Sequence, residues 1–194
     1  MDNTQTITQI TRNHAQKRLG FTSSCIRNCT TCGIVNKDSI VTSGSTGHSF
    51  AGLTDGRILT CESTNIVYCI TCSGCKQQYV GMSTRSLNER LREHLNFSKK
   101  GTKTGTYIYD HFNAENCGFS KITVQILFQS DIRKKDEAKA ELLAMEDKWI
   151  RQLNTAFPFG MNSKISGYGS ITDNINPLNS CKQPYFVLPI KRRK

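Results

Sequence analysis

A hairpin built around closely spaced cysteines is the feature of this sequence that most constrains its fold. The stretch 65–81 reads NIVYCITCSGCKQQYVG. Its β-branched and aromatic residues predict strands at 65–71 and 78–83, joined by a turn that carries the cysteines. Cys72 and Cys75 are separated by two residues, a spacing that lets both sulfur atoms bind one metal ion. We therefore expect this hairpin to hold a chemical site.

Helical periodicity predicts two long helices after the hairpin. Leucines recur at helical spacing in TRSLNERLREHLNFSKK, residues 84–100, where Ser83 or Thr84 is the expected N-cap. The segment DEAKAELLAMEDKWIRQLN predicts the best helix of the chain at 136–154, with Asp136 as its N-cap.

A third strand and a short helix complete the predicted fold. KITVQILFQ, residues 121–129, alternates two sets of side chains, which is typical of a half-buried strand. TYIYDHFNA, residues 106–114, favours a short helix. The order strand, strand, helix, strand, helix around a small antiparallel sheet indicates an α+β fold.

The sequence divides into four expected parts. They are a polar N-terminal lead at 1–20, a cysteine-rich zinc-binding segment at 21–63, the α+β domain at 64–164 and a basic C-terminal tail at 165–194. The second part surrounds a Gly/Ser/Thr-rich stretch that buries little apolar surface by itself, so it needs a stabilising cross-link such as a metal ion. The tail ends in KRRK, which is typical of either a nuclear import signal or an arm that grips DNA.

The charge of the chain favours nucleic acid as its partner. The formal net charge is +11, and basic residues cluster between Lys76 and Lys103. No apolar run approaches the roughly 18 residues of a membrane span, and the N-terminus lacks the apolar core of a signal peptide. We therefore expect an intracellular protein that binds DNA, without membrane association and with reduced thiols.

The nine cysteines are expected to bind metal rather than to form disulfides. The two CxxC pairs are Cys29 with Cys32 and Cys72 with Cys75. Together they predict one tetrahedral structural zinc that clamps the cysteine-rich segment onto the hairpin. Cys25 and Cys61 are competing ligands, and Cys69 is expected to pack inside the fold. Buried free thiols are the alternative interpretation.

A single carboxylate interrupts the apolar face of the last helix. Glu146 shares that face with Leu142, Leu143, Trp149, Ile150 and Leu153. An unpaired buried carboxylate is costly, so Glu146 is expected to meet a cation or hydrogen-bond donors. The alternative is that it lies at the edge of the stripe and points to water.

Two further pairs of residues are candidates for a catalytic site. Arg90 and His94 are four residues apart on the first long helix and project from the same face, where a solvated charged surface is the alternative. A hairpin centred at 73–74 would place Tyr68 and Tyr79 directly opposite each other, where packed aromatics are the alternative.

Together these groups suit the hydrolysis of a phosphodiester with one metal ion. Such a reaction needs a base for water, positive charge near the phosphorus and a metal near the leaving oxygen. Two phenols, a guanidinium, an imidazole and an isolated carboxylate supply these requirements.

The same residues resemble the motifs of the GIY-YIG nuclease family. IVY at 66–68 and YVG at 79–81 are similar to its paired tyrosine motifs, although Ile66 stands where the family has glycine. The family continues with the residue types found here at Arg90, His94, Glu146 and Asn162. With the upstream cysteines, LTCESTNIVYCITCSGCKQQYVG and EDKWIRQLNTAFPFGMN closely resemble the endonuclease domain of Penelope-like retroelements, over about residues 25–163.

This resemblance implies a three-stranded antiparallel sheet flanked by helices and a role for each site residue. Glu146 would hold a single Mg²⁺ or Mn²⁺. Tyr68 would accept the proton of water, in a relay with Tyr79 or His94, and Arg90 would stabilise the phosphorane. The asparagine at position 162 would support the site or contact DNA.

The resemblance also implies a biological setting. Such a nuclease nicks target DNA in the nucleus, which exposes a 3′ end for the reverse transcriptase of the parent element. Two alternatives share the charge and cysteines: a zinc-stapled DNA-binding module without cleavage, and a structure-specific repair nuclease of the same fold. A pure binder has no need of a carboxylate in a basic groove, where it repels phosphate.

Overall fold

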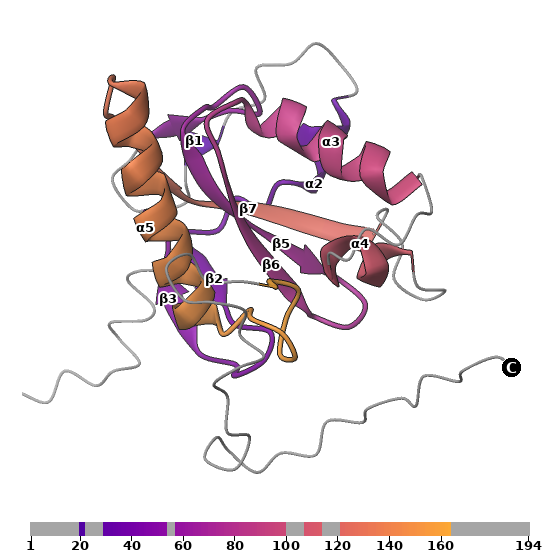
Figure 1. Ribbon diagram of the computed structural model, residues 1–194. Coiled ribbons are helices and arrows are strands. Elements are labelled where there is room, and N and C mark those ends of the chain that lie inside the picture. The colour runs from indigo at the N-terminus through magenta and orange to yellow at the C-terminus, as the bar shows by residue number, and fades with distance from the viewer. Residues whose placement is uncertain (1–19, 22–28, 54–56, 100–106, 114–120, 164–194) are drawn as a thin grey trace, which may run out of the picture.

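A three-stranded antiparallel sheet lies at the centre of the computed structural model, which describes residues 20–21, 29–53, 57–99, 107–113 and 121–163 (Figure 1). Its strands are β5 (Ile66–Cys72), β6 (Gln78–Ser83) and β7 (Ile122–Gln129). They are ordered β6-β5-β7, so β5 is central and β6 lies at an edge. The predicted fold class is confirmed.

Helices cover both faces of this sheet. Figure 1 shows α3 (Leu87–Lys99) and α4 (Tyr107–Phe112) on one side and α5 (Lys135–Leu153) on the other. Because side chains alternate along a strand, β5 contributes to two separate cores.

Among the helices that the structure describes, none has the length and apolar character of a membrane span.

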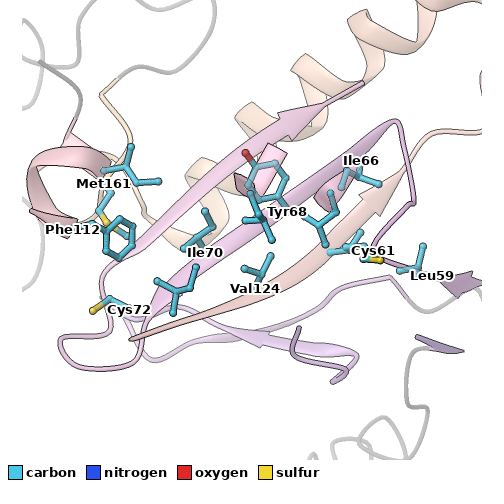
Figure 2. Close-up of a cluster of buried hydrophobic side chains, with 14 of the residues drawn as sticks. Leu59, Cys61, Ile66, Tyr68, Ile70, Cys72, Phe112, Val124 and Met161 are labelled. Atoms are coloured by element: carbon cyan, nitrogen blue, oxygen red, sulfur yellow. The ribbon is translucent and has the colours of Figure 1, made fainter. Parts of the chain in front are cut away.

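The two cores follow the alternation of β5. Ile66, Tyr68 and Ile70 belong to the core under α3 and α4, as Figure 2 shows for their side chains. Val67 and Cys69 point to the other face and pack in the core with α5. Both faces are therefore buried.

The N-terminal segment packs against the domain rather than standing apart from it. It contains β1 (Gly20–Phe21), α2 (Thr30–Ile34), β2 (Ile40–Thr42), β3 (Ser49–Ala51) and β4 (Ile58–Leu59). β1 pairs with β4 in parallel, and β2 pairs with β3 in antiparallel orientation. Val41 and Phe50 pack into the α5 core, whereas Cys29 and Cys32 pack against the other core. This segment therefore buries its few apolar side chains on both faces of the sheet.

The register of the hairpin corrects one prediction. Tyr68 pairs with Gly81, and Tyr79 pairs with Ile70, so the two tyrosines are diagonal neighbours rather than directly opposite. The turn is centred one residue later than expected, and Lys76 adopts a φ of 67° within it. Because the pairing differs from the expected one by two residues, the partner of Tyr68 changes while both phenols stay on the same face, as predicted.

Both predicted helix caps are wrong. The N-cap of α3 is made by Ser86, whose Oγ accepts a hydrogen bond from Glu89 N while the Glu89 carboxylate accepts one from Ser86 N. This reciprocal pair is a capping box, and it replaces the expected Ser83 or Thr84. In α5 the N-cap is Lys134, without a side-chain cap bond, and Asp136 lies inside the first turn.

The third strand is more buried than its sequence suggested. Gln125 and Leu127, on the face expected to meet water, are buried. The Gln125 amide nitrogen donates to the carbonyl oxygens of Asp38 and Ile40 at 2.6 and 3.1 Å. The segment before the hairpin thus covers a face that the alternation alone predicts as half-exposed.

The outer edge of β6 is capped by chain segments that follow α5. Backbone groups on a free strand edge need partners when they are buried. The Asn162 amide bonds both Val80 N (2.9 Å) and Val80 O (2.7 Å), and Met161 N donates to Gln78 O at 2.8 Å. Thr155 Oγ1 also donates to Asn162 Oδ1 at 2.8 Å. The predicted site residue Asn162 therefore turns its amide inward and holds the strand.

We expect Asn162→Ala to lower the free energy of unfolding by about 2–4 kcal/mol, because it leaves buried N–H and C=O groups of Val80 without partners. Chemical denaturation measures this loss. Asn113→Ala, at an exposed position, is the control and is expected to change stability by less than about 0.5 kcal/mol. Equal stability of the two variants would show that β6 does not depend on this cap.

Candidate active site

The hydroxyl of Tyr68 is the meeting point of the candidate active site. Arg90 Nε donates to it at 3.1 Å, and His94 Nε2 lies 2.8 Å from it. Arg90 and His94 reach it from one face of α3, as their four-residue spacing predicts. The structure thus brings two other predicted site residues to the fully buried phenol of Tyr68.

The absence of a side chain at Gly81 makes this arrangement possible. A Cβ atom at that position would lie 2.7 Å from Tyr79 Cε1 and 2.8 Å from the Tyr68 hydroxyl oxygen. Both distances are shorter than real Cβ contacts. The glycine that ends YVG is therefore required for the two tyrosines to lie over the same part of β6.

Tyr79 completes the aromatic wall of the site. Its ring centroid lies 6.4 Å from that of Tyr68 and 5.6 Å from that of His94. Burial raises the pKa of Tyr79 to about 12, and burial together with Tyr79 raises the pKa of Tyr68 well above its usual value. Both phenols therefore carry their protons near neutral pH, and Tyr79 is the more exposed of the two.

Arg90 is the fixed positive charge of the site. Burial lowers its pKa, but contacts with Tyr68 and Glu93 raise the pKa overall, so it stays charged. Its Nη1 donates to Glu93 Oε2 at 2.9 Å, which orients the guanidinium. Glu93 was not identified from the sequence, although its position three residues after Arg90 on a helix is a signal for such an ion pair.

His94 is neutral and held at both nitrogens. Burial, helped by the charge of Arg90, lowers its pKa to about 3. Its Nδ1 lies 3.2 Å from the hydroxyl of Tyr109, on α4. Sequence reasoning missed Tyr109, because it reaches His94 from another helix and no local spacing connects them.

Glu146 faces the site from the opposite helix. Its Oε1 accepts a hydrogen bond from Met82 N at 3.1 Å, next to Gly81 on the outer edge of β6. Burial raises the pKa of Glu146 to about 7, while the Met82 N–H and Arg90 lower it less strongly. The expected donor for this carboxylate is thus a backbone N–H. The charge of Glu146 also raises the pKa of both phenols, so it acts on the same site.

The cysteines form two groups instead of the single predicted one. Cys29, Cys32 and Cys61 bring their sulfur atoms within 4.8 Å of one another, and so do the ligand atoms of a second group, Cys72, Cys75 and His111. The four CxxC cysteines therefore do not share one site. The hairpin turn instead faces α4, where Cys75 Sγ lies 3.5 Å from His111 Nε2.

The remaining cysteine assignments are resolved in part. Cys69 packs in the α5 core, as predicted, and burial raises its pKa to about 12, so it remains a thiol. Cys61, expected as a competing ligand, joins the group of Cys29 and Cys32. Cys25 lies outside the described residues. Either group could hold a metal ion through soft sulfur ligands.

Comparison with known proteins identifies the family of this site. A family model described as the GIY-YIG catalytic domain matches residues 64–162, just over half of the chain. The chain therefore belongs to the GIY-YIG family. This membership confirms the predicted enzyme class, a DNA endonuclease that hydrolyses phosphodiester bonds.

Two solved structures are similar to the chain. Both are catalytic domains of the intron-encoded homing endonuclease I-TevI, one of them a mutant, and each is 22% identical in sequence. They cover 53% and 50% of this chain and 96% of their own, with TM-scores of 0.43 and 0.40. A search of the curated proteins gives no match.

The pKa of Glu146 generates a prediction about stability. Without added Mg²⁺ or Mn²⁺, Glu146→Gln is expected to raise the free energy of unfolding at pH 8 by about 1–3 kcal/mol. Because its folded-state pKa is raised from 4.5 to about 7, the folded protein binds more protons than the unfolded chain between these values. Stability therefore falls as the pH rises through this window, and Gln removes that fall.

Denaturant unfolding at pH 5 and pH 8 tests this expectation. The advantage of Glu146→Gln should be several-fold larger at pH 8 than at pH 5, whereas Glu137→Gln, at an exposed position of α5, should show no such difference. A Glu146→Gln variant that is less stable than wild type at pH 8 would contradict the raised pKa of the Glu146 carboxylate.

Proposed function

We propose that this protein is a metal-dependent DNA nickase, and that it cuts target sites in the manner of a Penelope-like retroelement endonuclease. One observation carries the proposal: a carboxylate with a raised pKa faces a half-buried guanidinium and two phenols across β6. Catalysis of phosphodiester hydrolysis requires these charges in one water-poor place. The net charge of +11 supports a polyanionic substrate.

The donor set at Glu146 fits a hard divalent cation. Mg²⁺ and Mn²⁺ prefer carboxylate oxygen and usually bind through one or two carboxylates together with phosphate and water. A half-buried carboxylate that is costly to ionise alone gains most from such a partner. A Mg²⁺ or Mn²⁺ ion held by Glu146 would supply positive charge that stabilises the leaving group.

The residues of the chain then have separate roles in the reaction. Arg90 stabilises the charge that develops on the phosphorane oxygens, because its guanidinium is fixed by Glu93 and never loses its charge. Tyr68 accepts the proton of the attacking water on its hydroxyl oxygen while its own phenolic proton passes to His94 Nε2, 2.8 Å away. Since Tyr68 is fully buried in the DNA-free protein, water reaches it only after neighbouring side chains move on DNA binding. Tyr79, which is more exposed, lines that approach.

The two alternative functions differ from this proposal in specific ways. A zinc-stapled binding module without cleavage has no use for Glu146, whose charge opposes phosphate unless a cation is present. A repair nuclease would use the same chemistry on branched DNA. The Penelope-like assignment rests on the resemblance of the cysteine-containing hairpin and of the segment EDKWIRQLNTAFPFGMN. It implies a nuclear protein that works with a reverse transcriptase.

The two cysteine groups support structural zinc as a second cofactor. Cys29, Cys32 and Cys61 lie under α3, and each group offers three of the four ligands of a tetrahedral site. A zinc ion at the first group would join α2 to Cys61 within the N-terminal segment, and one at the second group would fasten α4 to the hairpin turn. Zinc here would act on folding and not on the phosphodiester.

We expect Glu146→Ala to reduce nicking of supercoiled plasmid in Mg²⁺ by about a thousandfold or more, since it removes the metal ligand of the site. DNA binding in a gel-shift assay should survive. Glu137→Ala, on the same helix but exposed, should nick like wild type. Full cutting by Glu146→Ala would refute the metal assignment, and a wild-type protein that binds but never cuts would favour the binding module.

Elemental analysis of the reduced, folded protein is expected to find about two zinc ions per chain. Cys61→Ala should lower this value to about one, because it removes a ligand of one group only. Cys69→Ala should leave it unchanged, since Cys69 packs in the α5 core. Folded wild-type protein without any zinc would remove the case for structural metal.

A further inference from the structure

Within the described residues, the Tyr68 hydroxyl has one hydrogen-bond acceptor for its proton. The Tyr68 side chain has no solvent exposure, so water does not take this proton. Arg90 Nε is itself a donor, and it occupies one of the two lone pairs of the Tyr68 oxygen. Among the residues that the structure describes, the acceptor left for the Tyr68 proton is His94 Nε2, at 2.8 Å. A buried hydroxyl proton without an acceptor is costly, so Tyr68 donates to His94.

This direction fixes the tautomer of His94. A neutral imidazole has one nitrogen that accepts and one that carries a hydrogen. When Nε2 accepts the Tyr68 proton, Nδ1 must carry the hydrogen. The Tyr109 hydroxyl, 3.2 Å away, is then its acceptor. Tyr109 is half-buried, so its own proton can be given to solvent.

We propose that Tyr109 is a positioning residue, which accepts the Nδ1–H of His94 and so holds the tautomer that leaves one lone pair of the Tyr68 oxygen free for the attacking water. The inference rests on the proposed nuclease function, which it deepens. Tyr109 does not touch the DNA or the reacting atoms. It acts through His94.

The opposite tautomer would disable Tyr68 as a base. His94 Nε2–H would then donate to the Tyr68 oxygen, which already accepts from Arg90 Nε. Both lone pairs would be occupied, and the oxygen would have no place for a hydrogen of water. The Tyr68 proton would also lose its only described acceptor. The hydrogen bond between His94 Nδ1–H and the Tyr109 hydroxyl therefore selects between the two tautomers of His94.

Removal of that hydroxyl leaves the packing around it intact. The Tyr109 ring lies 5.8 Å from His94 and 5.4 Å from Phe97, measured between ring centroids, and a phenylalanine ring keeps both contacts. Tyr109→Phe thus separates hydrogen bonding from packing. Tyr107→Phe, two residues earlier on α4, is the matched control, because the Tyr107 ring stacks on Phe157 and has no described contact with His94.

The direct test is the tautomer of His94, measured by ¹⁵N NMR of histidine-labelled full-length protein without DNA. Wild type and Tyr107→Phe are expected to show hydrogen on Nδ1. Tyr109→Phe is expected to shift the population toward hydrogen on Nε2. A wild-type signal from the Nε2–H form would overturn the proposal, and so would a Tyr109→Phe protein with an unchanged tautomer.

Single-turnover nicking adds a readout that a purely structural role would not produce. Tyr109→Phe should lower the cleavage rate of bound DNA by roughly ten- to a hundredfold, as for other groups that fix an imidazole, while DNA affinity and the Tyr107→Phe rate stay at wild-type values. An unchanged rate would overturn the proposal. If wild type itself fails to nick, the proposed function fails, and the NMR result still decides whether Tyr109 sets the tautomer.

Discussion

The outer edge of β6 is the constraint on which the site depends. An edge strand exposes backbone N–H and C=O groups that need partners. Here the Asn162 amide bonds the backbone N–H and C=O of Val80, and Met161 N donates to Gln78 O. The Glu146 carboxylate accepts from Met82 N. The same strand carries the tyrosine and glycine of YVG. The bonds that complete the sheet therefore also bring the carboxylate of α5 to the phenols.

The electrostatic balance of the site follows from this burial. The guanidinium of Arg90, paired with Glu93, and the carboxylate of Glu146 face neutral aromatic groups at a partly buried place. At low dielectric a charge without a partner is expensive, so each group is either neutral or specifically bound. His94 and the phenols stay neutral, whereas Glu146 has a pKa of about 7 and exchanges a proton for a cation readily. Under the proposed function, this balance would let the site bind a divalent ion together with phosphate.

Residues at fixed local spacings were predictable from the sequence, and contacts set by loops were not. Arg90 and His94 are one helical turn apart, so any helix over that segment brings them together, and Glu146 stands out within an apolar stripe. The hairpin turn, in contrast, is centred one residue later than expected, which changes the partner of Tyr79. The cysteines separate into two groups for a related reason, because α4 brings a histidine to the turn. Tyr109 reaches its partner from the same helix, and no sequence pattern encodes that contact.

The central claim is that one divalent ion binds between the Glu146 carboxylate and a DNA phosphate, beside Arg90. Anomalous diffraction from crystals of the protein with DNA and Mn²⁺ tests it most directly. We expect one manganese peak per chain at the Glu146 carboxylate oxygens, with the phosphate on the side of Tyr68 and Arg90. A complex with DNA bound at Tyr68 and Arg90 and no manganese at Glu146, or with manganese held elsewhere, would contradict the account.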